Sequence, residues 1–278
     1  MTIIQPNASA PTSCGACKDG TAAPFPFTMA FQPIVDTASR TVFAYEALVR
    51  GRHGEPASEI LSRVTQDNRY AFDQSCRIKA ITLAAKLGLA ATGARLSVNF
   101  MPGAVYSPQA CIQQTLRAAR ENNFPLKSLM FEITEDEKVR DPGHLQRIIT
   151  EYRKHGFAIA LDDFGAGFSG LNVLAEVAVD IIKLDAHLVR NIHLQPRTQA
   201  IVQSLARLCR TLKVQLIGEC VETLEEYEVL RHCGIDLMQG YLFAKPAFEA
   251  LPRITWPIAR PMFAEPIAAS SHASQRTN

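Results

Sequence analysis

Residues 158–163 read Ala158-Ile159-Ala160-Leu161-Asp162-Asp163, a short apolar run that ends in two carboxylates. An apolar run of this length with a polar end is typical of a strand buried in a parallel sheet. The segment before it has the spacing of an amphipathic helix, with a glycine at a C-cap position: Leu145, Ile148, Ile149, Tyr152 and Gly156. A helix followed directly by a buried strand is the unit from which α/β folds are built.

The same alternation runs through most of the chain. Segments of strand character occur at Met29–Val35, Val42–Val49, Leu96–Phe100, Leu129–Ile133, Ala158–Leu161, Ile181–Leu184, Val214–Ile217 and, more weakly, near Leu237. A second helical stripe consists of Ile201, Leu205, Leu208 and Leu212. Thr223 and Glu226 have capping-box spacing, and Gly234 is placed to end that helix. Eight candidate strands in about 230 residues fit a (β/α)₈ barrel, with a doubly wound open sheet as the alternative.

Composition narrows the class of protein. The chain has 278 residues, of which 47% are hydrophobic and 20% charged, with a net charge of +2. This charge offers no electrostatic case for a nucleic acid polymer or an anionic membrane as partner. No apolar run is long enough to span a membrane, and the N-terminus lacks the pattern of a secretory signal. Seven cysteines, an odd number, favour reduced thiols and therefore a cytoplasmic protein.

The two ends of the chain differ from its middle. Residues 1–26, rich in Ala, Pro, Thr and Gly, predict a flexible leader, and residues 258–278 predict a flexible tail, leaving one domain at 27–257. The leader contains Cys14 and Cys17, a CxxC spacing that suits a metal or a redox pair. Zinc would need two further ligands and the sequence has no second CxxC, so the simpler interpretation is that these cysteines are incidental.

Polar residues able to bind a cation or a phosphate follow seven of the apolar runs. They are Glu46, Asn99, Glu132, Asp162 with Asp163, Lys183, Glu219 and Gln239. In a barrel, the carboxyl ends of the parallel strands meet at one face, which is where active sites of this fold lie. Any one of these residues is unremarkable as a surface polar residue, but seven at equivalent positions predict a site.

The charges of this set predict bound cations. Two carboxylates ~4 Å apart repel by roughly 4 kcal/mol at an effective dielectric of about 20. Oxygen ligands select hard metals, so Mg²⁺ or Mn²⁺ is expected, with two ions neutralising most of the charge. No HExxH motif or i, i+4 histidine pair supports zinc. Two hard cations suit phosphodiester hydrolysis, and Lys183 would add a point charge beside the nucleophile or the phosphate.

The same residues also resemble a known family. Glu46-Ala47-Leu48-Val49-Arg50 resembles the signature that names the EAL-domain phosphodiesterases. The family's other motifs follow in order: Gln32-Pro33-Ile34-Val35, Ser97-Val98-Asn99-Phe100, Phe131-Glu132-Ile133-Thr134-Glu135, Asp162-Asp163-Phe164-Gly165-Ala166-Gly167, Ile182-Lys183-Leu184-Asp185, Glu219-Cys220-Val221-Glu222-Thr223 and Gln239-Gly240-Tyr241. The similarity covers roughly residues 27 to 250, and the ordered set is highly specific.

The resemblance implies a fold and an activity. The family fold is a TIM-like (β/α)₈ barrel whose first strand runs antiparallel to its neighbour. Its members cleave cyclic di-GMP to linear pGpG with two Mg²⁺ or Mn²⁺ ions per site. The resemblance also implies a homodimer in which residues 164–170 link the interface to the site.

Roles are carried over position by position. The resemblance implies that Glu46, Asn99, Glu132 and Asp162 bind the first metal, and that Asp162 and Asp163 bind the second with Glu219 nearby. Glu219 and Lys183 resemble the groups that orient or deprotonate the attacking water, and either could be the base. Substrate contacts are implied for Gln32, Arg50 and Gln239. Supporting roles are implied for Glu135, which resembles a loop anchor, and for Glu222, which resembles a carboxylate near the metals.

Some positions depart from the family pattern. Cys220 stands where glycine is usual, Gly51 follows Arg50 where a bulkier residue is frequent, and the loop after Asp163 differs at several positions. None of these removes an implied metal ligand. EAL domains that lose catalysis survive as cyclic di-GMP receptors or interaction modules, usually with a ligand missing. The complete ligand set therefore favours an enzyme, with the receptor as the alternative.

Overall fold

Eight strands close into a barrel in the computed structural model, which describes residues 23–134, 142–167 and 170–258. The strands are β1 (Thr28–Asp36), β2 (Thr41–Arg50), β3 (Arg95–Asn99), β4 (Leu129–Thr134), β5 (Ala158–Phe164), β6 (Ile181–Leu184), β7 (Gln215–Gly218) and β8 (Leu237–Gln239). Each strand from β2 to β8 pairs in parallel with the next, and β1 closes the ring by pairing antiparallel with both β2 and β8. The TIM-like barrel with one antiparallel strand is confirmed, and the open-sheet alternative is wrong.

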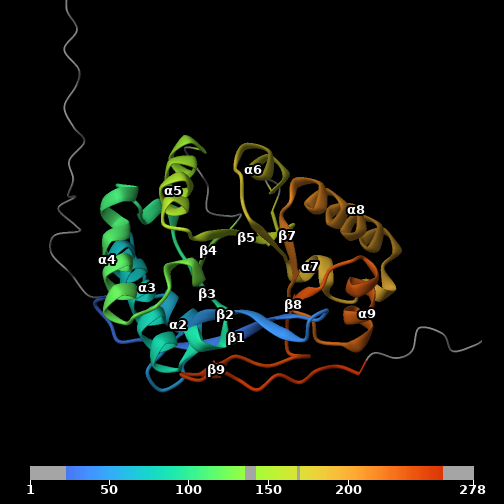
Figure 1. The fold of residues 1–278 in the computed structure, drawn as a ribbon, viewed down its shortest axis with the longest axis horizontal. Coiled ribbons are helices and arrows are strands. Elements are labelled where there is room, and N and C mark those ends of the chain that lie inside the picture. Colours follow the sequence, from blue (N-terminus) through green and yellow to red (C-terminus); the bar gives the residue numbers. More distant parts are fainter. Residues whose placement is uncertain (1–22, 135–141, 168–169, 259–278) are drawn as a thin grey trace, which may run out of the picture.

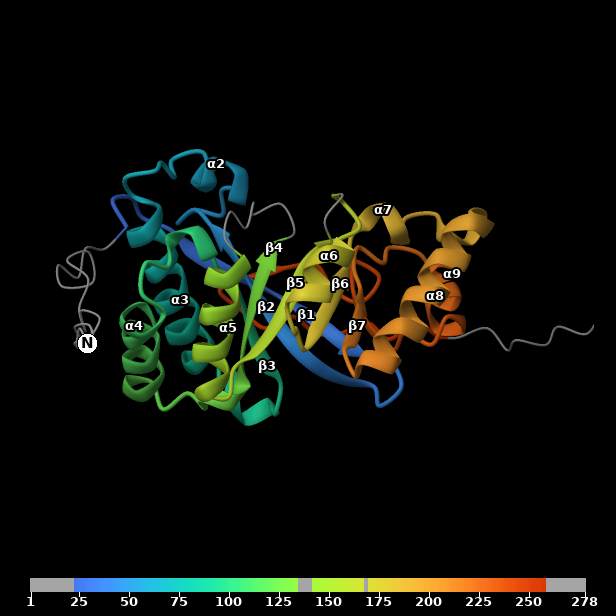
Figure 2. The ribbon, with the colours of Figure 1, turned by 90° about the horizontal axis from the view of Figure 1, so that it is seen from above.

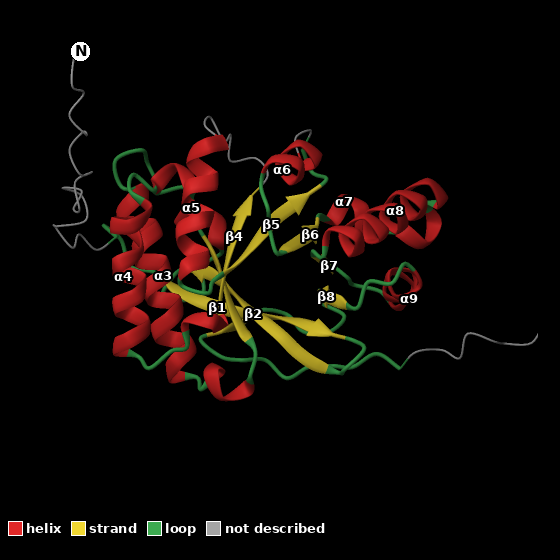
Figure 3. Cartoon of the chain, turned by 45° about the horizontal axis from the view of Figure 1, so that its top comes forward, coloured by secondary structure: helices red, strands yellow, loops and turns green. Residues whose placement is uncertain are grey.

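Helices surround the strands, as the views in Figures 1 and 3 show. They are α2 (Ala57–Leu61), α3 (Arg69–Lys86), α4 (Pro108–Glu121), α5 (Pro142–Lys154), α6 (Gly170–Glu176), α7 (Ala186–Val189), α8 (Pro196–Leu212) and α9 (Leu224–His232). Short 3₁₀ turns occur at Leu89–Thr92, Pro102–Ala104, Leu126–Ser128 and Ile192–Leu194. Helices α3, α4 and α5 lie together on one flank, and α8 and α9 lie on the other (Figures 1 and 2). None of the helices in the described ranges combines the length and apolar character needed to cross a membrane.

A ninth strand was not anticipated from the sequence. β9 (Ala247–Phe248) pairs antiparallel with β1 at Ala30 and Phe31, beyond the part of β1 that pairs with β8. Two residues are too few to show an alternating pattern, so this strand has no sequence signal of its own. It extends the sheet along the half of β1 that β8 does not reach.

The capping-box prediction for α9 is confirmed. The Thr223 hydroxyl accepts a hydrogen bond from the Glu226 N–H at 3.2 Å, and the Glu226 carboxylate accepts one from the Thr223 N–H at 3.1 Å. Glu226 also accepts from the backbone N–H groups of Glu222 and Asn191, both at 2.9 Å. One buried carboxylate thus orders the loop that follows β7.

The stripe predicted for α8 marks a helix, but of its four residues only Leu205 packs against the core. Ile201, Leu208 and Leu212 are 45%, 36% and 47% exposed, whereas the buried residues are Val202, Ala206 and Cys209. The apolar arc of this helix is wide enough to contain two stripes of the same period. Small side chains at 206 and 209 let the helix approach the strands closely, and periodicity alone cannot detect that preference.

The described domain begins before residue 27. The rings of Phe25 and Phe27 lie 5.6 and 5.4 Å from that of Phe72 on α3, and the Ala23 N–H donates to the Ser75 hydroxyl at 3.0 Å. The segment from residue 23 therefore packs on α3. Of the predicted leader, residues 1–22 lie outside the described residues, as does the predicted tail from residue 259.

Candidate metal centre

The side chains that point into the barrel form two layers, a polar layer stacked on an apolar one. The lower interior layer is apolar: Ile34, Ala44, Met130, Ala160, Ile181, Ile217 and Leu237. Because side chains two residues apart on a strand share a face, the next interior layer is set two residues further along each strand. That layer contains Gln32, Glu46, Glu132, Asp162, Lys183, Glu219 and Gln239. β1 runs antiparallel to the other strands, so its residue in the polar layer is Gln32, two positions before Ile34. Gln32 pairs in register with Glu46 on β2.

Lys183 lies at the centre of this polar layer and is 1% exposed. Its ammonium nitrogen lies 2.7 Å from Glu219, 2.9 Å from Glu132, 3.0 Å from Asp162 and 3.5 Å from Glu46, measured to a carboxylate oxygen in each case. One buried cation thus faces four carboxylates. The imbalance is three negative charges, before Asp163 is counted.

Neutral polar side chains also donate hydrogen bonds to these carboxylates. Glu46 accepts hydrogen bonds from the side-chain amides of Asn99 at 3.1 Å and Gln239 at 2.8 Å. The buried Ser97 hydroxyl donates to Glu132. Ser97 was not anticipated from the sequence, although its place two residues before Asn99 puts both side chains on one face of β3.

The carboxylates form two groups that share Asp162. One group is Glu46, Glu132 and Asp162, and the other is Asp162, Asp163 and Glu219; within each, one oxygen per residue lies within 4.8 Å of the others. The Oδ1 atom of Asp162 is buried and accepts no hydrogen bond in the described parts of the chain, although Lys183 lies 3.0 Å away. That one ammonium ion is shared among four carboxylates, so most of their negative charge remains uncompensated. The donor set therefore fits hard divalent cations, and Asp162 belongs to both groups.

Three carboxyl groups have raised pKa values, because they are buried among other carboxylates and Lys183 alone does not balance their charge. Burial raises the pKa of Glu219 to about 8, against the opposing effect of Lys183. Burial and the neighbouring charge of Asp162 raise the pKa of Asp163 to about 6. Burial and the charge of Glu46 likewise hold the pKa of Glu132 well above its usual range. Protein groups alone therefore leave this cluster partly protonated near neutral pH.

Lys183 and Glu46 are shifted the other way, towards the charged form. Burial by itself lowers the pKa of Lys183, but the carboxylates of Asp162, Glu132, Glu219 and Glu46 outweigh it and leave that pKa well above its ordinary value. Burial raises the pKa of Glu46, but Lys183 and the amides of Gln239 and Asn99 outweigh burial and leave it below its ordinary value. Lys183 therefore remains an ammonium ion throughout the physiological range.

Several residues of the expected site lie outside this cluster. Gln32 is buried in the polar layer and donates to the Ala244 carbonyl at 3.2 Å. Arg50, at the end of β2, donates to the carbonyl of its neighbour Val49 at 2.7 Å. Glu222 is exposed and pairs with Arg190 at 3.5 Å rather than with the acidic cluster. Glu135 lies outside the described residues.

A cavity of about 360 Å³ opens directly beside the acidic residues. Asp162, Asp163 and Asn99 line it together with apolar side chains including Leu48, Leu61 and Phe72. A cavity lined by both apolar and acidic side chains suits a ligand that carries a flat ring and a phosphate bound through cations.

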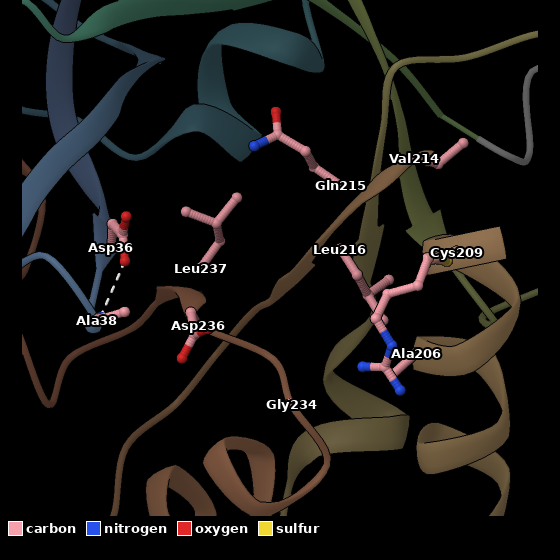
Figure 4. Close-up of a pocket in the computed structure, with 11 residues that line it drawn as sticks. Asp36, Ala38, Ala206, Cys209, Val214, Gln215, Leu216, Gly234, Asp236 and Leu237 are labelled. Carbon is pink, nitrogen blue, oxygen red and sulfur yellow. Dashed lines mark hydrogen bonds between the residues drawn. The ribbon is translucent and has the colours of Figure 1, made fainter. Parts of the chain in front are cut away.

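A second cavity, of about 290 Å³, lies at the opposite end of the barrel. Figure 4 shows Asp36, Leu237 and Leu216 around it, with Cys209 contributed by α8. It contains none of the expected site residues. It adjoins the amino-terminal ends of the parallel strands, the face that serves stability rather than chemistry in barrels of this kind.

Comparison with known proteins agrees with this geometry. The EAL domain family model matches residues 26–246. Over 228 residues the chain is 31% identical to the blue light- and temperature-regulated antirepressor BluF of Escherichia coli K12, covering 82% of this chain and 56% of the relative. Over 226 residues it is 28% identical to the cyclic di-GMP phosphodiesterase PA2567 of Pseudomonas aeruginosa, covering 79% of this chain and 38% of the relative. The chain thus spans about half or less of the length of these two relatives.

Solved structures give the same result. A standalone EAL protein from Vibrio cholerae O395 in its cyclic di-GMP-bound form is 50% identical, with a TM-score of 0.80, covering 84% of this chain and 97% of that one. Klebsiella pneumoniae BlrP1 in a manganese and cyclic di-GMP complex is 35% identical, with a TM-score of 0.80, covering 85% of this chain and 60% of that one. With the barrel, the ordered motifs and the acidic centre, these matches establish that the chain belongs to the EAL domain family.

Proposed function

We propose that this protein hydrolyses cyclic di-GMP to linear pGpG with two divalent cations, Mg²⁺ or Mn²⁺. The observation that carries the proposal is the sharing of Asp162 between two carboxylate groups, with a buried lysine among them. The proposal is further supported by relatives named as cyclic di-GMP phosphodiesterases and by the manganese and cyclic di-GMP complex of BlrP1.

Each group of oxygens is assigned one cation. Glu46, Glu132, Asp162 and the side-chain oxygen of Asn99 would hold the first, and Asp162, Asp163 and Glu219 the second. Bound there, the two ions would lower the pKa of a coordinated water and stabilise charge on the phosphorus oxygens. The protein's own part is to hold the oxygens in place and to exclude bulk water from the layer beneath.

Glu219 is the better candidate for the base that takes the proton of the attacking water. The carboxylates around Lys183, Asp162 above all, raise its pKa well above the ordinary value, which favours the ammonium form over a role as base. Burial raises the pKa of Glu219 to about 8 when no cation is bound, and bound cations would lower it, so that the ionised carboxylate could accept a proton. Lys183 then orients Glu219 from 2.7 Å and offsets negative charge at the phosphate.

Substrate contacts are proposed around the mouth of the barrel. One guanine would occupy the 360 Å³ cavity, with Leu48 and Leu61 against its faces. Arg50, which meets only a backbone carbonyl in the described contacts, is suited to a phosphate oxygen pair. Gln32 and Gln239 lie in the same layer as the acidic residues and would contact the ligand from β1 and β8.

A homodimer is also proposed. Leu171 on α6 and Ile201, Leu208 and Leu212 on α8 are exposed apolar side chains, and the two helices lie on the same side of the barrel (Figure 1). Exposed apolar side chains favour protein association. A cytoplasmic location is proposed on the strength of five free thiols among the described cysteines.

A cyclic di-GMP receptor without turnover is the second candidate. The match to BluF, named as an antirepressor, favours it, because that relative is 31% identical over most of this chain. The complete set of acidic residues favours the enzyme. Incubation of the purified protein with cyclic di-GMP and Mg²⁺ or Mn²⁺, followed by chromatography of the nucleotides, separates the two: pGpG supports the enzyme, and retained intact dinucleotide supports the receptor.

A further inference from the structure

A buried ion pair lies on the outer side of the barrel, behind the acidic centre. Arg77 and Asp73 on α3 are 0% and 3% exposed, and the Arg77 guanidinium donates to the Asp73 carboxylate. Arg77 also donates to the Tyr152 hydroxyl on α5 at 2.8 Å. Burying two charges costs much of what their attraction returns, so well-packed apolar residues would serve stability as well or better. The pair therefore calls for an explanation other than stability.

Asp73 contacts the segment that carries an expected metal ligand. Its second carboxylate oxygen accepts the Met101 N–H at 2.9 Å, two residues after Asn99. On the other side, the Phe100 N–H donates to the Glu132 carbonyl at 3.0 Å. The chain leaving β3 is thus held between α3 and β4 immediately after Asn99.

Arg77 packs against the aromatic residues next to two expected ligands. Its guanidinium carbon lies 5.4 Å from the centre of the Phe100 ring and 5.6 Å from that of Phe131, within the range of cation–π attraction. Phe131 immediately precedes Glu132, and strand alternation turns the ring outwards where the carboxylate turns inwards. Fixing the ring therefore fixes the rotation of the strand end that aims Glu132 into the barrel.

From these contacts we infer that Asp73 and Arg77 are positioning residues for the metal centre, acting on Asn99 through Met101 and on Glu132 through Phe131. The inference rests on the proposed function only in taking those two side chains as metal ligands. Asp73, Phe72 and Met101 also line the 360 Å³ cavity. The same network therefore shapes the wall of the proposed substrate slot.

Two double variants separate positioning from stability. Asp73→Asn with Arg77→Met removes both charges but keeps a side-chain oxygen for the Met101 N–H. Asp73→Leu with Arg77→Met removes both charges and that acceptor. Loss of partners that orient metal ligands typically weakens metal affinity about 10–100-fold. We expect a loss of that size in the leucine variant and a smaller one in the asparagine variant.

The measurement is Mn²⁺ affinity of the full chain, from the electron paramagnetic resonance signal of free Mn²⁺, alongside thermal unfolding and hydrolysis of cyclic di-GMP. Val202→Ala is the control, because it removes buried volume on α8 across the barrel. It should lower the unfolding temperature and leave Mn²⁺ affinity unchanged. Mn²⁺ affinity equal to that of the wild type in both double variants, or a matching loss in Val202→Ala, would overturn the inference.

A further variant covers the case in which the leucine protein does not fold. Tyr152→Phe keeps the ring and removes only the hydroxyl that Arg77 contacts, so a weaker Mn²⁺ affinity supports the inference and an unchanged one overturns it. Failure of the proposed function appears differently. A wild-type protein that binds Mn²⁺ but leaves cyclic di-GMP intact would reject phosphodiesterase activity, while the Mn²⁺ data would still decide the role of the ion pair.

Discussion

The ammonium nitrogen of Lys183 lies 2.7 Å from a carboxylate oxygen of Glu219, and both side chains are buried inside the barrel. Neither group could remain charged at this depth alone. Asp162, Glu132 and Glu219 together raise the pKa of Lys183, and the proposed mechanism gives Glu219 the exchange of a proton with water.

Replacing Lys183 with methionine should destabilise the metal-free protein. Removing one partner of a buried charge cluster costs about 3–5 kcal/mol, because the remaining charges are left uncompensated. The loss should be larger at pH 8 than at pH 6, where more of the carboxyl groups are protonated, and saturating Mn²⁺ should reduce it. Chemical denaturation at the two pH values, with and without Mn²⁺, measures each effect.

Lys154→Met is the matched control for that variant. Lys154 is 63% exposed and pairs with Glu151 at 2.9 Å, so its loss should cost at most about 1 kcal/mol. Similar losses in the two lysine variants would show that Lys183 does not balance the buried carboxylates.

The stability of the metal-free protein should fall as pH rises. Folding raises the pKa of Glu219 from its ordinary 4.5 to about 8, so the folded state binds more protons than the unfolded state between those values. Each such proton lowers the unfolding free energy by roughly 1.4 kcal/mol per pH unit. Asp163 contributes in the same direction up to about pH 6.

Saturating Mg²⁺ should flatten this dependence, because a bound cation holds the carboxylates ionised. Thermal unfolding from pH 5 to pH 8.5, with Mg²⁺ or with a chelator, is the measurement. If the metal-free protein instead becomes more stable across this range, the acidic centre is not protonated as described.

Cys220→Gly should stabilise the protein. Cys220 has a φ of 54°, in the left-handed region that residues other than glycine, asparagine and aspartate rarely adopt. Glycine removes a backbone cost of about 1–2 kcal/mol, partly offset by the greater freedom of the unfolded chain. Cys220→Ala, which keeps the Cβ atom, should give no comparable gain. Urea denaturation of both variants tests this, and equal stabilities would place the effect in the thiol rather than in the backbone.

Residues 23–26 should contribute to stability. Deleting residues 1–26 should lower the unfolding temperature by removing Phe25 from its contact with Phe72. Replacing Cys14 and Cys17 with serine should leave activity equal under oxidising and reducing conditions. A redox response that disappears in the serine variant would instead give the leader a sensory role.

The sequence predicted the barrel well because its signals are local. Asp162 follows a continuous apolar strand, and Thr223 with Glu226 forms a cap that depends on spacing alone. Site positions such as Glu46 and Glu219 were predictable because neighbouring strands bring polar residues that follow apolar runs to the same level of the barrel. Glu46 nevertheless lies within β2, which continues to Arg50, whereas Glu219 directly follows β7. The direction of β1 came from family resemblance, since its composition does not reveal which way it runs.

What the sequence did not predict depends on packing between distant elements. The exposed stripe around Ile201 and Leu208 could not be separated from the buried one around Val202, because both have helical period. The Arg77–Asp73 pair joins α3 to β3, β4 and α5. Its role depends on contacts between residues far apart in the sequence, which local patterns do not reveal. Glu222 matched a family position, yet its carboxylate lies with Arg190 at the surface.

The most direct measurement is nucleotide turnover by the wild-type protein and by Asp162→Ala, with folding followed by circular dichroism. Asp162 belongs to both carboxylate groups, so its loss should remove both cations while the apolar layer beneath keeps the barrel folded. With Mg²⁺ or Mn²⁺, we expect pGpG from the wild type and none above background from a folded Asp162→Ala. A wild type that binds cyclic di-GMP without cleaving it, or an Asp162→Ala protein that cleaves at the wild-type rate, would contradict this expectation.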